Sequence, residues 1–156
     1  MGLENFAKKA SAAGVSGVLT VDLPCEEAQE YRKNLKENGL DTVFLASPTT
    51  APDRLKAISD ASTGFVYYVS RTGVTGVQSE VSQTLSSEIE QLREKVDQPL
   101  VIGFGISNAE QARKVGNLGD GVVIGSAIVK MIEAGSDSQA VASKIRDFAR
   151  SIKSAL

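Results

Sequence analysis

The stretch GDGVVIGSAIV, residues 119–129, decides how the rest of the sequence is interpreted. Three consecutive β-branched residues, Val122–Ile124, predict a strand that is buried on both faces, because no polar residues alternate with them. The strand runs into Gly125-Ser126, and a helix-like pattern follows. Two residues this small let a backbone amide and a hydroxyl both touch an anion, so we expect this strand end to face a phosphate group.

Four further apolar runs precede this strand, and helical patterns lie between them. The expected strands are Val18–Val21, Val43–Ala46, Phe65–Val69, Leu100–Ile102 and Val122–Ile124. Helices are expected over Leu3–Ala13, Glu26–Asn38, Pro52–Ser59 and Ser138–Leu156, with two more that open at the capping boxes Ser87–Glu90 and Ser107–Glu110. Strands that alternate with helices predict an α/β fold with parallel strands.

Such an order belongs either to an open doubly wound sheet or to part of a TIM (β/α)₈ barrel. A complete barrel takes about 250 residues and eight strands. This chain has 156 residues and five strand patterns, and no linker or repeat divides it. Spacing alone therefore favours a single α/β domain over residues 1–156 with a five-stranded open sheet, and leaves the partial barrel as the alternative.

The composition excludes several kinds of site. The formal net charge is −2 and the basic residues are scattered, so we expect no nucleic-acid partner. No apolar run approaches the ~20 residues that span a membrane. With no histidine and only Cys25, catalysis by Ser-His-Asp or Cys-His and the usual zinc site are excluded, and we expect no metal. One cysteine forms no internal disulfide, which suits the cytoplasm.

Ligands of parallel α/β folds bind at the carboxyl ends of the strands. Three of the five predicted ends are rich in Gly, Ser and Thr: residues 70–76 (SRTGVTG), 103–107 (GFGIS) and 125–126 (GS). Hydrogen bonds to a charged group contribute ~1.5–3 kcal/mol each. Three converging loops can therefore hold a phosphate monoester without any lysine, although a single glycine-rich loop is more often structural.

The segment from Arg71 to Leu85 has no apolar periodicity. Loops of that length are usually functional or mobile. With Gly73 and Gly76 as hinges, this segment is predicted to be a lid over the ligand.

Few side chains suit acid–base or covalent chemistry. Asp22 is the only acid at a strand's carboxyl end, where it is either a catalytic group or one that orients the neighbouring backbone. Asp41 and Asp120 precede strands and belong to the opposite, structural face. Tyr67 and Tyr68 point to opposite sides of their strand, so one of them lines the ligand side.

No residue suggests covalent catalysis. Every lysine falls in a helical pattern, which argues against a Schiff-base aldolase. Cys25 stands at a helix start, where a thiol pKa can be lowered, but a passive cysteine is the favoured interpretation.

Four motifs together resemble the tryptophan synthase α chain, in order and over essentially the whole chain. They are GVLTVDLPCEEA (17–28), GFVYYVSRTGVTG (64–76), PLVIGFGIS (99–107) and DGVVIGSAIVK (120–130). The resemblance implies a (β/α)₈ barrel that cleaves indole-3-glycerol phosphate to indole and glyceraldehyde 3-phosphate. It also implies a pyridoxal-phosphate β chain as the partner that receives the indole, and no cofactor in this chain itself.

The resemblance assigns the substrate contacts by position. Thr75 matches the lid residue that closes over the site, Tyr67 matches the tyrosine beside the substrate, and Asp22 with Pro24 matches the strand end near the substrate and the β chain. The phosphate cradle matches the glycines of the lid and of the last two strand ends. The implied substrate-binding residues are Asp22, Tyr67, Thr75, Gly76, Phe104, Gly105, Gly125 and Ser126.

The resemblance also implies that the family's first three βα units are missing here. The two catalytic carboxylates of the family, a Glu at the end of the second strand and an Asp in the loop after it, lie in that part, so no catalytic residue is assigned. Positioned acid–base groups contribute ~10²–10⁴-fold each. We therefore expect this chain to bind a phosphate ester but to be inactive alone.

Two other functions remain as alternatives to this one. The first is a non-catalytic module whose cradle has collapsed; the second is a sugar-phosphate isomerase, against which the absence of histidine counts. In either case five open strands would expose two apolar edges, which predicts a rearranged compact sheet or a homodimer.

Overall fold

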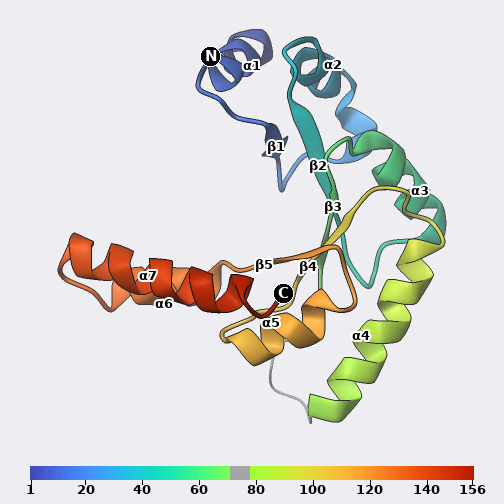
Figure 1. The fold of residues 1–156 in the computed structure, drawn as a ribbon. Coiled ribbons are helices and arrows are strands. Elements are labelled where there is room, and N and C mark those ends of the chain that lie inside the picture. The colour runs from blue at the N-terminus through green and yellow to red at the C-terminus, as the bar shows by residue number, and fades with distance from the viewer. Residues whose placement is uncertain (71–77) are drawn as a thin grey trace. The chain divides into compact units, whose positions relative to one another are not determined.

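The structure, a computed structural model, describes residues 1–70 and 78–156, without the side chains of residues 78–84. Strands alternate with helices along the chain (Figure 1). The elements are α1 (Leu3–Ala12), β1 (Gly17–Leu19), the 3₁₀ helix η1 (Cys25–Glu27), α2 (Gln29–Glu37), β2 (Asp41–Ala46), α3 (Pro52–Ala61), β3 (Val66–Val69), α4 (Gln78–Arg93), β4 (Leu100–Gly103), α5 (Ala109–Gly116), β5 (Gly121–Val123), α6 (Ser126–Glu133) and α7 (Ser138–Lys153).

The strands form one sheet in the order β1-β2-β3-β4-β5. The pairings β1–β2, β2–β3 and β4–β5 are parallel, as the alternating pattern predicted. Consecutive order is that of a (β/α)₈ barrel, whereas a doubly wound sheet reverses its order at a switch point. The expectation of an open doubly wound sheet from spacing alone is therefore wrong, and so is that of a rearranged sheet.

Two compact units make up the chain. The first unit consists of Met1–Tyr68 with Glu90–Leu100, and the second of Val69–Ile89 with Val101–Leu156.

The core of the first unit forms around β2. Thr42, Val43, Phe44 and Ala46 of this strand are buried, which agrees with the prediction of a strand covered on both faces. The helix α2 buries Tyr31 and Leu35, and α3 packs directly against β2. Polar groups are satisfied within this core: the Thr42 hydroxyl donates to the Ala61 carbonyl oxygen at 2.7 Å.

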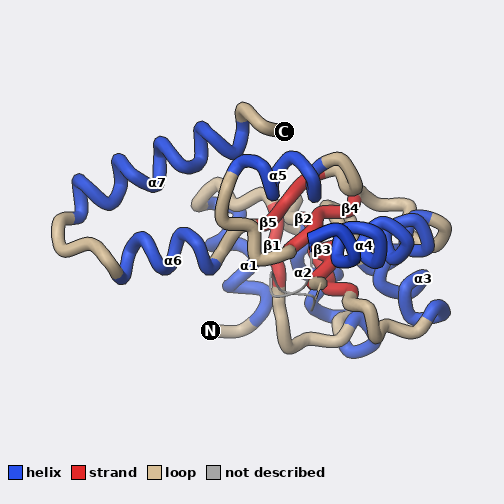
Figure 2. The backbone as a smooth tube through the Cα atoms, turned by 90° about the horizontal axis from the view of Figure 1, so that it is seen from below, coloured by secondary structure: helices blue, strands red, loops and turns tan. Residues whose placement is uncertain are grey.

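The second unit packs its helices around β4 and β5. Buried side chains of β4, the following loop and α5 form its core: Ile102, Ile106, Ala112 and Val115. The helices α6 and α7 lie side by side, and α7 also contacts α5 (Figure 2). Of the apolar stripe predicted for α7, only Ile152 is buried, whereas Val141, Ile145 and Phe148 are half-buried.

The two strands at the ends of the sheet are less buried than the sequence predicted. Leu19 of β1 is 38% exposed, and Val122, Val123 and Ile124 are all only half-buried. A run of apolar residues predicts burial on both faces only where neighbouring elements supply both covers. β1 and β5 each have a strand neighbour on one side alone, which explains the difference.

Two predicted helix starts are wrong. Ser87 lies inside α4, which begins at Gln78. Leu85 is buried with Ile89 and Leu92 and extends their stripe by one turn, which shows that the helix continues before Ser87. At α5 the N-cap is Asn108, whose side chain accepts from the Gln111 backbone N–H at 2.9 Å.

The other helices agree closely with the patterns. The predicted helix Glu26–Asn38 divides into η1 and α2, and Gly39 follows α2 with φ +70°, as expected of a glycine that ends a helix. Pro52 occupies the first turn of α3, as predicted. Among the helices of residues 1–70 and 78–156, none combines the length and the apolar character needed to cross a membrane.

Candidate functional site

The strands β4 and β5 end side by side in the second unit. Gly103 and Val123 are register partners in this parallel pair, so the loops that follow them start at the same edge of the sheet. The Ser70 N–H donates to the Gly103 carbonyl oxygen at 3.1 Å, which brings the residue after β3 to the same edge. The structure therefore groups four of the predicted site residues here, namely Phe104, Gly105, Gly125 and Ser126.

The loop after β4 has a fixed backbone shape. Gly105 has φ +65°, a left-handed conformation that strains any residue with a side chain. Its neighbours anchor it, because Ile106 is 1% exposed and Phe104 is half-buried, while Gly105 itself is exposed. The loop therefore presents the peptide groups around Gly105 to solvent.

A polar clamp holds the far side of this loop, and the sequence patterns missed it. The Ser107 N–H and hydroxyl both donate to the Gln111 side-chain oxygen, at 2.8 and 3.0 Å. Gln111 in turn donates its backbone N–H to Asn108. A sequence signal for this clamp exists, because Asn108 is followed three residues later by Gln111. This Asn–Gln pair lies one residue after the predicted capping box, Ser107–Glu110.

The loop after β5 ends at the start of α6. Gly125 is the N-cap, and its carbonyl oxygen accepts from the backbone N–H groups of Ile128 and Val129 at 2.9 and 3.1 Å. The N–H groups of the first two residues of a helix, here Ser126 and Ala127, have no acceptor within the helix and lie at the positive end of its dipole. Gly125 and Ser126 are both exposed, so this helix start is open to an anion.

The glycine at position 125 is not explained by the packing of the chain. Its φ is −117°, which other residues adopt, and a Cβ built there would meet nothing within 4 Å. Neither a positive φ nor a close neighbour therefore requires a glycine at this position. The open space in front of Gly125 is instead what a ligand that approaches the backbone would need.

The predicted lid is tested only in part. Thr75 and Gly76, with the hinge residue Gly73, lie outside the described residues. From Gln78 onward the segment belongs to α4, so the prediction of an irregular segment as far as Leu85 is wrong there.

Asp22 and Tyr67 belong to the first unit. Asp22 is exposed in the turn after β1 and lines a cavity of about 240 Å³ together with Pro24 and Arg54. Tyr67 pairs in register with Leu45 and is half-buried, whereas Tyr68 is 1% exposed. The two tyrosines thus differ in environment, as opposite faces of one strand require.

The acids predicted to be structural fit that assignment. Asp41 is the first residue of β2, and its carboxylate accepts from the Thr63 hydroxyl at 2.8 Å. Asp120 directly precedes β5. Within residues 1–70 and 78–156, no group of three His, Cys, Asp or Glu side chains is arranged to hold a metal ion.

Cys25 does not have the lowered pKa that would make it reactive. Partial burial raises the pKa of its thiol, and the adjacent Glu26 carboxylate raises it further. The pKa of Glu26 is lowered because its own backbone amide and the Cys25 thiol donate hydrogen bonds to its carboxylate. The Arg54 guanidinium, whose Nε lies 2.9 Å from Glu26 Oε1, lowers this pKa further. The raised pKa favours the passive interpretation of Cys25 over the reactive one.

We predict that iodoacetamide alkylates Cys25 at pH 8 more slowly than it alkylates glutathione, because less of a thiol with a raised pKa is ionised. Removing the neighbouring charge in Glu26→Gln should speed the reaction, whereas the matched change Glu27→Gln should not. Mass spectrometry of timed samples gives the rates. Alkylation of the unmodified chain faster than glutathione would contradict the assignment.

Comparison with known proteins decides the family. A family model described as tryptophan synthase alpha chain matches residues 1–156. The chain belongs to the tryptophan synthase alpha chain family. The resemblance found in the four sequence motifs is thereby confirmed.

Individual relatives agree on the family and on the extent of the match. The tryptophan synthase alpha chain of Neisseria meningitidis serogroup B is 46% identical over 155 residues, which are 98% of this chain and 59% of the relative. That of Geobacter sulfurreducens is 52% identical over 132 residues, 85% of this chain and 50% of the relative. The chain thus spans between half and three fifths of the length of these curated relatives.

Solved structures show the same fold. A structure of the tryptophan synthase α2β2 complex from Pyrococcus furiosus matches with a TM-score of 0.84 at 37% identity, covering 98% of this chain and 61% of that one. Tryptophan synthase from M. tuberculosis matches with a TM-score of 0.83 at 30% identity, and the match covers 99% of this chain and 55% of that chain. The five parallel βα units are therefore five of the eight units of a TIM barrel.

Proposed function

We propose that residues 1–156 carry the phosphate-binding half of a tryptophan synthase α chain. The family reaction is the retro-aldol cleavage of indole-3-glycerol phosphate to indole and glyceraldehyde 3-phosphate, a lyase step of tryptophan biosynthesis. One observation carries the proposal: the neighbouring ends of β4 and β5 combine a left-handed glycine turn with an exposed helix start. A phosphate ester is the ligand that this combination suits.

Backbone groups would supply most of the binding energy. The first N–H groups of α6 would donate to phosphate oxygens, and the Ser126 hydroxyl can add one bond. Hydrogen bonds to a charged group contribute about 1.5–3 kcal/mol each. Two or three of them would give a dissociation constant in the millimolar range or below, with no lysine required.

The proton transfers of the reaction are not assigned to any residue of this chain. In the family they belong to the Glu and the Asp that the resemblance places outside residues 1–156. Asp22 is exposed, and we propose that it orients the backbone of its turn rather than moving a proton. The chain would then bind the phosphate ester without converting it.

The test is a calorimetric titration of the purified chain with glycerol 3-phosphate, with glycerol as the matched control. Saturable heat with the phosphate ester alone supports the proposal. No heat with any phosphate ester would favour the alternative function, a family-like module whose cradle does not bind.

A β chain is the proposed protein partner. One of the solved relatives is described as an α2β2 complex. The resemblance matches Asp22 with Pro24 to the strand end where the family contacts its β chain. We place the protein in the cytoplasm, which a chain with a single unpaired cysteine suits.

We further propose that the open edge at β1 makes the chain self-associate as a homodimer. Leu19 and Val21 are 38% and 67% exposed next to this edge, and no lysine or proline protects the strand. Leu19→Lys with Val21→Lys should convert a dimer to a monomer in analytical ultracentrifugation, because two charges disfavour edge pairing. Ile132→Lys, on a half-exposed apolar residue of α6, is the control. A monomeric unmodified chain at high concentration would contradict the proposal.

A further inference from the structure

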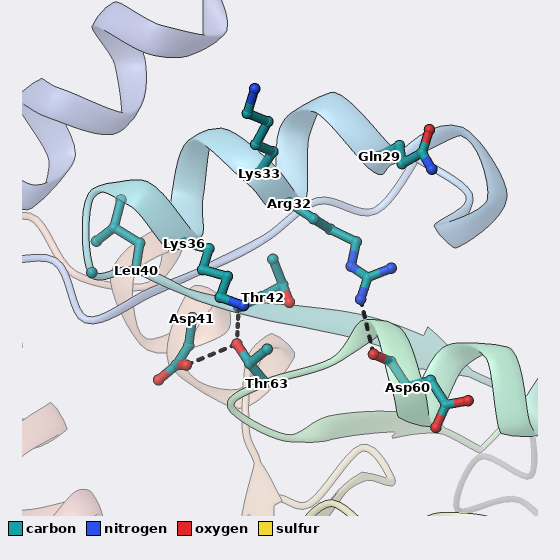
Figure 3. A pocket seen from close by; sticks show the side chains of 10 residues that line it. Gln29, Arg32, Lys33, Lys36, Leu40, Asp41, Thr42, Asp60 and Thr63 are labelled. Carbon is teal, nitrogen blue, oxygen red and sulfur yellow. Dashed lines mark hydrogen bonds between the residues drawn. The ribbon is translucent and has the colours of Figure 1, made fainter.

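A groove of about 590 Å³ in the first unit remains without a function. It lies beside the amino end of β2, between α2 and the connection from α3 to β3 (Figure 3). Arg32, Lys36, Leu40, Asp41 and Thr63 are among the residues that line it. Its volume is within the range of small-molecule sites, and it shares no residue with the phosphate site proposed above.

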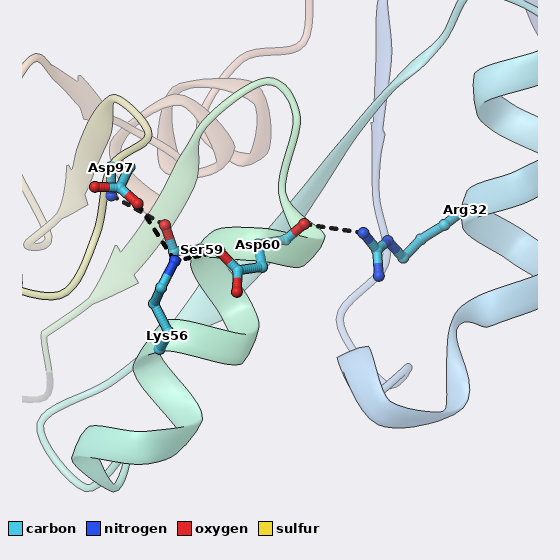
Figure 4. Close-up of polar contacts among 5 residues, drawn as sticks. All are labelled: Arg32, Lys56, Ser59, Asp60 and Asp97. Carbon is cyan, nitrogen blue, oxygen red and sulfur yellow. Dashed lines mark hydrogen bonds and ion pairs between the residues drawn. The ribbon is translucent and has the colours of Figure 1, made fainter.

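The two carboxylates at the groove are already engaged. Asp60 forms an ion pair with Lys56 of the same helix at 2.5 Å, and Lys56 also lies 3.5 Å from Asp97 (Figure 4). The carboxylate of Asp41 accepts from the Thr63 hydroxyl at 2.8 Å. Neither acid forms an ion pair with the cations of α2.

Two cations of α2, Arg32 and Lys36, have no acidic partner among the described residues. Arg32 donates to the main-chain oxygen of Asp60 at 2.9 Å, which holds its guanidinium at the groove and uses only one of its five N–H groups. In the described part of the chain, no carboxylate lies within 4.0 Å of Arg32 or Lys36. Lys33 also lines the groove, but it has an acidic partner, because its ammonium lies 3.9 Å from the Glu37 carboxylate.

The position of the pair on the helix adds a geometric reason. Arg32 and Lys36 are four residues apart, so their side chains leave the same face of α2. The planar guanidinium can hold one anionic group through two parallel N–H bonds, and the ammonium of Lys36 acts as a point charge for a second group. A lysine at a helix C-terminus interacts favourably with the helix dipole, which is one reason for Lys36. This interaction does not explain Arg32, which lies in the middle of the helix.

We propose that this groove binds a small molecule with two neighbouring anionic groups, of the diphosphate type, between Arg32 and Lys36. One group lies on the guanidinium that Asp60 orients, and the other lies on the Lys36 ammonium. Leu40 and Thr63, which carry no charge themselves, accommodate the part of the molecule between or beside the two groups, while the Asp41 carboxylate stays bonded to the Thr63 hydroxyl.

The test uses pyrophosphate as the probe and the full chain with Gly125→Asp as the background, so that the strand-end phosphate site cannot contribute. Calorimetry should give saturable binding to one site. Arg32→Gln and Lys36→Gln should each weaken it at least tenfold, whereas Lys33→Gln should leave it within twofold. Inorganic phosphate, which offers one group, should bind at least tenfold more weakly.

Three outcomes would overturn the proposal: no saturable binding of pyrophosphate, equal affinity for phosphate, or a loss in Lys33→Gln as large as in Lys36→Gln. Lys36→Gln removes no hydrogen bond or ion pair within the described residues, so its thermal unfolding midpoint should stay close to that of the background, and an unchanged midpoint shows that loss of binding is not unfolding. Because the background already lacks the strand-end site, failure of that proposed function would leave this result unchanged.

Discussion

Indole release from indole-3-glycerol phosphate is expected to be about 10⁴–10⁸-fold slower with residues 1–156 than with a full-length family member such as the Neisseria meningitidis α chain. The reason is the number of positioned acid–base groups. Each contributes about 10²–10⁴-fold, and the resemblance places both of the family's catalytic carboxylates outside this sequence. Chromatographic detection of indole after long incubation gives the rate.

A residual rate needs a control, because a trace of host enzyme would mimic slow catalysis. The variant Gly125→Asp should abolish activity that belongs to this chain and leave a contaminant's activity unchanged. Activity within about a hundredfold of the full-length relative, and sensitive to Gly125→Asp, would show that residues 1–156 contain an acid–base pair that the motifs did not indicate.

The sequence predicted the features of the fold that depend on interactions between residues close in the chain, and not those that depend on residues far apart. The βα units were predictable because each has its own local signals, such as Gly39 after α2 and Pro52 at the start of α3. The strand order was not, because a doubly wound sheet and a barrel have the same spacing of elements. Only the pairing of distant residues across β3 and β4, such as the Val66 N–H that donates to the Pro99 carbonyl oxygen, distinguishes this order from one in which β4 lies beside β1.

The candidate site was predictable for a similar reason, and only in part. The ends of β4 and β5 follow from the apolar runs, so Gly105 and Gly125 could be placed at one edge of the sheet. The left-handed backbone of Gly105 and the open space at Gly125 are not local properties of those glycines. The groove beside α2 was missed because it depends on Asp60, whose charge is engaged by Lys56.

Glycerol 3-phosphate is expected to bind the Gly125→Asp variant about 100-fold more weakly than the unmodified chain. Two effects of the new carboxylate combine. An aspartate at an N-cap accepts the backbone N–H groups of the first turn, which are the donors that a phosphate would use. Its charge also repels the phosphate dianion, by an energy on the order of 1–4 kcal/mol at about 4 Å according to how much water screens it.

The fold of this variant should survive, which makes the result interpretable. A Cβ at position 125 meets nothing within 4 Å, and aspartate is a better N-cap than glycine by a few tenths of a kcal/mol. The midpoint of thermal unfolding should therefore stay the same or rise while binding is lost. Gly125→Asn is the matched control, since it caps the helix equally well without a charge and should lose clearly less affinity than aspartate. Equal losses in both variants would mean that blocked N–H donors or lost space outweigh charge. Unchanged binding in both would mean that the phosphate does not lie at the start of α6.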